Sequence, residues 1–152
     1  MIQFENALVR YLNDSSLGLP YWDWSEREES WINLVSPIDM IDYNNQWSFG
    51  YNPITGYETE RYPAEFKSKQ YSKKIQNAKC KTDFFEFYPI LEQLHATIHR
   101  TIDGDMGYLE SAAFDPIFFL NHNFVEKVFE EWQLCRNQAN DTVWFDRYAI
   151  SS

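Results

Sequence analysis

The sequence SAAFDPIFFLNH, residues 111–122, decides how this chain is organised. Asp115 followed by Pro116 is typical of a helix start, because aspartate accepts hydrogen bonds from free N–H groups and proline fits the first turn. From there, apolar residues recur at helical spacing. The pattern predicts a long helix over residues 116–135 that carries His122 just after its first turn.

A second long helix is predicted upstream, over residues 82–101, with Pro89 in the first turn of its main part. Within LEQLHATIHR, residues 91–100, His95 and His99 stand four apart and share one helix face. An antiparallel pair of these helices would bring a third imidazole beside the first two. Three neutral imidazoles suit copper or zinc and leave a position open for a small ligand. Pairs with this spacing also occur on helix surfaces that bind nothing, so spacing alone leaves both interpretations open.

The remaining patterns predict a mainly α fold. Helices are expected over residues 2–13 and 64–78. Residues 36–72 have no clean period but many aromatic residues, so we expect a long ordered loop region, with a flexible linker as the alternative. Trp22 and Trp24 are expected in the core.

Length and charge exclude several classes of protein. The 152 residues fit one domain, residues 1–152, and a fully formed core. The formal net charge of -10 disfavours nucleic acids and anionic membranes as partners. No apolar run approaches the ~20 residues of a membrane helix, and the N-terminal sequence does not resemble a signal peptide.

Two cysteines, Cys80 and Cys135, could form one disulfide that clamps the histidine helices together, or could be unrelated thiols. Glycosylation sequons at Asn13 and Asn140 are compatible with secretion, although such sequons often arise by chance. Together these features favour secretion or the lumen of the secretory pathway. The missing signal peptide argues the other way.

The motifs taken together resemble the type-3 copper proteins, the family of tyrosinases, catechol oxidases and hemocyanins. The resemblance runs over residues 2–135, and its most specific part is the DPIFFLNH segment in its context. The matching stretches are FENAL at 4–8, LPYWDW at 19–24, the histidine pair at 95 and 99, GDMG at 104–107, residues 111–122, and the Trp132-Gln133 pair.

This resemblance implies a helical bundle around two coppers, each held by three histidines. His95, His99 and His122 correspond to the ligands of the second copper, with no organic cofactor and no catalytic residue beyond the ligands. Asn121 stands where the family has a non-ligating histidine. No histidine precedes His95, so the chain is expected to be a partial four-helix-bundle copper domain lacking the first-copper half. It would be either a fragment of a longer protein or a genuine half-site protein.

When complete, such a protein is expected to oxidise phenols or catechols with dioxygen, as an oxidase or monooxygenase. This chain alone would be inactive. A hemocyanin-like oxygen carrier, or a non-catalytic metal-binding domain, is the alternative. Ala96 replaces an asparagine that the family often carries, which weakens the monophenol hydroxylase interpretation. Either Phe118 or Phe119 could shield the metal, and a homodimer could cover the exposed helix faces.

Overall fold

The computed structural model of the chain is helical in the part that it describes. The described residues are 2–14, 16, 18–26, 54, 56, 59–62, 64 and 68–138. The elements in chain order are α1 (Ile2–Leu12), α4 (Ser68–Lys79), α5 (Phe84–Ile102), the 3-10 helices η1 (Gly104–Gly107) and η2 (Ala112–Phe114), and α6 (Ile117–Gln138). The expected mainly α class is therefore confirmed, as are the expected helices, within a few residues at their ends.

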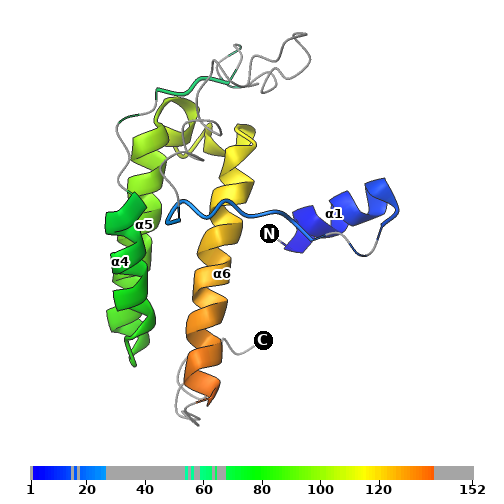
Figure 1. The fold of residues 1–152 in the computed structure, drawn as a ribbon. Coiled ribbons are helices and arrows are strands. Elements are labelled where there is room, and N and C mark those ends of the chain that lie inside the picture. Colours follow the sequence, from blue (N-terminus) through cyan, green and yellow to red (C-terminus); the bar gives the residue numbers. More distant parts are fainter. Residues whose placement is uncertain are drawn as a thin grey trace.

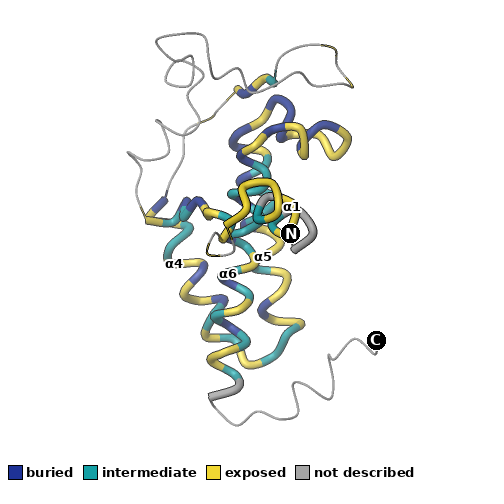
Figure 2. The backbone as a smooth tube through the Cα atoms, turned by 90° about the vertical axis from the view of Figure 1, so that its right-hand side faces the viewer, coloured by how far each residue is buried: buried dark blue, intermediate teal, exposed yellow. Residues whose placement is uncertain are grey.

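Helices α4, α5 and α6 lie side by side, and α5 runs antiparallel to α6 (Figure 1). Figure 2 shows buried positions recurring along these three helices. The fully buried core side chains of α5 and α6 follow the helical period, since one helix face must leave water for the helix to be stable. They include Leu94, Ile98, Phe124, Val128 and Trp132.

Pro89 lies further inside helix α5 than the sequence predicts. Asp83 caps it by accepting a hydrogen bond from the Phe85 N–H at 2.7 Å, which makes Pro89 the sixth helical residue rather than a first-turn residue. The prediction for Pro89 is thus wrong. A proline inside a helix costs about 3 kcal/mol. Phe87 is fully buried and stacks on Trp132 with ring centroids 4.5 Å apart, and we infer that this packing and the Asp83 cap offset that cost.

The segment 18–26 crosses α6 and joins it to α4 (Figure 1). The Trp22 N–H donates a hydrogen bond to the Leu120 carbonyl at 3.1 Å. Trp24 has no exposed surface and meets Phe124 edge-on at a centroid distance of 4.9 Å, with Tyr71 of α4 at 6.0 Å. Both tryptophans are core residues, as predicted, and they fix the start of α6 relative to α4.

Three sequence predictions concern other parts of the chain. Most of the aromatic loop region over 36–72 lies outside the described residues. Cys80 and Cys135 are both exposed free thiols, so the structure does not show the disulfide clamp. Within the described ranges, no helix combines the length and apolarity that crossing a bilayer requires.

Candidate metal centre

The three histidines of the chain meet between α5 and α6. The Nε2 atom of His122 lies 3.2 Å from Nε2 of His95 and 3.3 Å from Nε2 of His99. One nitrogen from each ring falls within 4.8 Å of the other two. The two helices therefore bring all three sequence-predicted ligands to one point, as an antiparallel pair should.

The ring of His99 is held by the chain segment that follows α5. Its Nδ1 atom lies 2.8 Å from the Met106 carbonyl oxygen. A carbonyl can only accept, so Nδ1 carries the proton and Nε2 keeps its lone pair for the shared centre. Metal-binding histidines are usually oriented in this way by a partner of the second ring nitrogen. Sequence reasoning noted the GDMG motif but missed the contact, since nothing in one sequence pairs a ring with a backbone carbonyl seven residues later.

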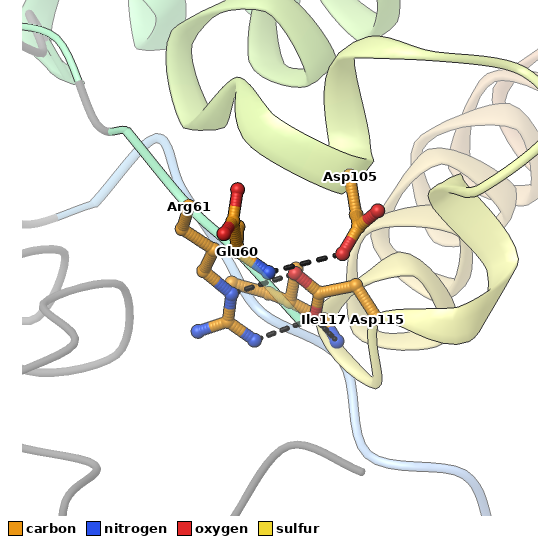
Figure 3. A network of polar contacts seen from close by, with 5 residues as sticks. All are labelled: Glu60, Arg61, Asp105, Asp115 and Ile117. Carbon is orange, nitrogen blue, oxygen red and sulfur yellow. Dashed lines mark hydrogen bonds and ion pairs between the residues drawn. The ribbon is translucent and has the colours of Figure 1, made fainter. Parts of the chain in front are cut away.

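That segment is fixed by residues 59–62, a stretch without regular secondary structure (Figure 3). The Asp105 N–H donates to the Glu60 carbonyl at 2.9 Å, and the Glu60 N–H donates to the Asp105 carboxylate at 3.0 Å. Gly104 adopts a φ of +58°, and a Cβ atom there would lie 2.1 Å from the Glu60 carbonyl oxygen. Only glycine fits such a close approach at positive φ.

An ion pair buried in the same region joins this stretch to α6. The Arg61 guanidinium donates two hydrogen bonds to the Asp115 carboxylate, at 2.6 and 2.5 Å, and both side chains are almost fully buried. Asp115 also accepts from the Ile117 N–H at 2.9 Å, so it caps α6 as predicted. Sequence analysis did not select Arg61, because an arginine in an aperiodic region gives no signal of a partner 54 residues away.

Phe118 lies directly against the histidines. Its ring centroid is 4.0 Å from that of His122 and 6.0 Å from that of His99. Phe119 meets Phe118 edge-on, with ring centroids 5.3 Å apart. The structure therefore places Phe118, of the two candidates, against the histidine cluster.

Burial favours the neutral imidazole form of His95 and His122 by lowering the pKa of each ring. Burial first, and then the neighbouring rings of His95 and His99, lower the pKa of His122 from 6.5 to about 4. Burial also lowers the pKa of His95, with the His99 ring adding to the effect. Neutral imidazole is the form that binds a metal.

A cavity of about 410 Å³ opens over the three rings. Its remaining lining is mostly small or apolar, with Glu92 and Arg100 adding charge; it includes Ala96, Met106, Tyr108, Leu109, Ala113 and Phe118. Tyr108 and Leu109 are exposed beside it. The ring nitrogens are thus accessible to a small molecule.

The spacing of the ring nitrogens fits one small metal ion. Imidazole nitrogens about 2.0–2.1 Å from a tetrahedral ion lie roughly 3.3 Å apart. The distances from Nε2 of His122 to Nε2 of His95 and of His99, 3.2 and 3.3 Å, match that value. Three neutral imidazoles favour copper or zinc among the biological metals. The residues present therefore fit a copper ion.

Comparison with known proteins gives the family. The family described as the common central domain of tyrosinase matches residues 44–134, more than half of the chain. The chain belongs to the tyrosinase family. Its helical fold is consistent with a type-3 copper protein, a family whose cofactor is copper, and its three histidines form a group that could hold a metal ion.

Relatives of this chain include hemocyanins of Megathura crenulata and Helix pomatia. The chain is 33% identical over 147 residues to Hemocyanin 1 of Megathura crenulata and 29% identical over 146 residues to its Hemocyanin 2, matching 88% of this chain in each case. It is 30% identical over 145 residues to the beta-C chain unit G hemocyanin of Helix pomatia, over 86% of this chain. The matches span only 4% of each Megathura protein and 34% of the Helix protein.

Proposed function

We propose that His95, His99 and His122 bind one copper ion through their Nε2 atoms and form the second-copper half of a type-3 centre. The observation that carries the proposal is the convergence of three Nε2 atoms with a spacing that fits a single ion. Copper, when bound, supplies reversible dioxygen binding and one-electron redox chemistry.

The protein's own contribution is to favour the neutral form of two of the histidines, to orient the third, and to cover one ring. Burial suppresses protonation of His122 and His95. The Met106 carbonyl fixes the tautomer of His99. Phe118 covers the His122 ring and excludes water from that side. The three rings also line the cavity, together with Phe118, and a small ligand can approach them there.

Dioxygen binding of the hemocyanin kind is the function that we favour for the protein in which these residues work. The named relatives are hemocyanins, and they match most of the chain. The family's dioxygen site uses two coppers, so a second set of three ligands must come from elsewhere. A further segment of a longer protein would supply it. A homodimer pairing two such centres is the other arrangement to test.

The experiment for the metal site is a copper(II) titration of the chain, followed by electron paramagnetic resonance and metal content. We expect one resonance-visible copper per chain. His99→Ala should remove most of the affinity, whereas Gln93→Ala, an exposed position on the same helix, should bind copper like the parent. Equal copper content in His99→Ala and the parent would refute the site.

Oxidation of phenols or catechols is the second candidate function. The open cavity supports it, because about 410 Å³ accommodates a small aromatic ring beside the histidines and the lining is largely apolar. Ala96 makes room there but provides no polar group for a phenol. Quinone formation from catechol by the copper-loaded protein, in its longest expressed form, would support oxidation. Reversible dioxygen uptake without quinone formation would favour oxygen binding as the function.

Location and assembly are further proposals. The two sequons and the hemocyanin relatives support secretion or the secretory-pathway lumen. Sedimentation of the copper-loaded chain tests the homodimer. If the chain is monomeric at all concentrations tested, the homodimer is excluded, and a longer protein would have to supply the ligands of the other copper.

A further inference from the structure

His95 has a carboxylate close to the ring nitrogen that does not face the other two histidines. Glu92 stands three residues earlier on α5, and its Oε2 atom lies 3.7 Å from Nδ1 of His95. Residues three apart on a helix face each other. The carboxylate is therefore on the side of the ring opposite Nε2, the atom that faces the histidine cluster.

This arrangement parallels the one at His99. There, the Met106 carbonyl fixes the proton on Nδ1 and leaves Nε2 free. At His95 the nearby acceptor is a charged side chain instead of a backbone group. At 3.7 Å the contact is electrostatic or bridged by water, because direct hydrogen bonds are shorter. Both acceptors favour the same tautomer, with Nε2 unprotonated and directed at the centre.

Two observations argue against a purely structural role for Glu92. The side chain is 52% exposed, so the core does not depend on it. It also lines the cavity over the three rings, next to Ala96. The side chain of Ala96 offers the carboxylate no hydrogen bond, and among the described residues the polar partner of Glu92 is the His95 imidazole.

We propose that Glu92 is a positioning residue that holds His95 in the Nδ1-protonated tautomer, so that Nε2 is presented to copper. The inference rests on the proposed copper site. Partners of this kind, one step removed from the metal, typically change metal affinity by about 10- to 100-fold when they are removed.

The test compares the copper(II) affinity of four proteins by competition with a chelator of known affinity. Glu92→Leu removes both the charge and the acceptor. Glu92→Gln removes the charge but keeps an oxygen that can accept from Nδ1–H. Glu130→Gln is the matched control, because it removes one charge from an exposed position on α6, two turns beyond His122. Melting temperatures without metal check that each variant folds.

We expect about 10-fold or greater loss of affinity in Glu92→Leu. Glu92→Gln should recover most of it, and Glu130→Gln should match the parent. The nitrogen couplings in the paramagnetic resonance spectrum should change in Glu92→Leu and not in the control. Parent-like affinity in Glu92→Leu would overturn the inference, and so would equal losses in the Leu and Gln variants, which would indicate charge alone.

The outcomes also separate this inference from the proposed function. If the parent binds no copper, or if His99→Ala binds as well as the parent, the copper site itself is wrong. If the parent binds copper through His99 and the Glu92 variants bind equally well, the copper site stands and only the role of Glu92 is wrong.

Discussion

The indole Nε1 of Trp24 donates a hydrogen bond to Oδ1 of Asn121 at 3.0 Å, and neither side chain has exposed surface. The two residues are 97 positions apart. Asn121 immediately precedes His122, so this bond ties the crossing segment to the turn of α6 that carries the histidine. The family often has a histidine at this position, and asparagine here provides the acceptor that a buried indole N–H requires.

Replacing Asn121 with alanine should lower the free energy of unfolding by about 1–3 kcal/mol, because the Trp24 N–H would be buried without an acceptor. Asn123→Ala is the matched control. Its amide donates to the Pro20 carbonyl at 3.0 Å at an exposed position, so its removal should cost about 0.5 kcal/mol or less. Urea denaturation of the two variants measures the difference, and equal losses would contradict the importance of the buried bond.

Because Arg61 and Asp115 form a buried ion pair, we expect the effects of substituting them on the free energy of unfolding to be non-additive. Arg61→Met should destabilise the protein by about 3–5 kcal/mol, since it leaves a buried carboxylate without its partner. The double variant Arg61→Met with Asp115→Asn should be more stable than additivity predicts, because the charge is gone and the amide oxygen can still cap α6. Additive losses in a double-mutant cycle would show that the two residues do not interact in this way.

Among the described glycines, Gly104 is the one at which an added methyl group meets the closest backbone atom. Gly104→Ala places Cβ 2.1 Å from the Glu60 carbonyl oxygen and puts an alanine at a φ of +58°, so we expect a loss of about 1–3 kcal/mol. In Gly18→Ala the nearest atom to the new Cβ would be 3.6 Å away, which is ordinary contact. Thermal melting should therefore distinguish the two variants, and a parent-like Gly104→Ala protein would refute the close approach.

Local signals in the sequence were sufficient for the helices and for the meeting of the histidines. Asp115 and Pro116 mark a helix start because capping depends on neighbouring atoms alone. His95 and His99 share a face because helix geometry fixes it. That these residues bind copper stays a proposal.

Contacts between distant segments were not predictable in the same way. The partner of Arg61 and the carbonyl that orients His99 depend on how separate segments pack. Pro89 is an example in which a local signal is present in the sequence but gives the wrong position in the helix. Its intrinsic preference pointed to a first turn, and the Asp83 cap and the packing of Phe87 on Trp132 accompany a helix that begins at Phe84, five residues before this proline. Tertiary packing thus overrides a local preference.

The protonation of His122 predicts how stability depends on pH in the metal-free protein. Its pKa falls from 6.5 in an unfolded chain to about 4 in the folded protein, first because of burial and then because of the two neighbouring rings. Below pH 6.5 the unfolded chain therefore binds more protons than the folded one. By linkage, the free energy of unfolding should fall as the pH drops from 6.5 toward 4, and this contribution is complete above 6.5.

A pKa shift of this size corresponds to a change of about 3 kcal/mol in the free energy of unfolding, at about 1.4 kcal/mol per pKa unit. Because the ring is partly exposed to solvent, we expect a change on the order of 1 kcal/mol. Urea denaturation between pH 7 and 5 measures it before most carboxylates titrate. His122→Gln, a neutral polar replacement, should flatten the slope, while His95, whose pKa is also lowered by burial, keeps a part of it. An unchanged slope in His122→Gln would mean that the His122 ring is not held neutral by the fold, and the same ring would then lose its advantage as a copper ligand at mildly acidic pH.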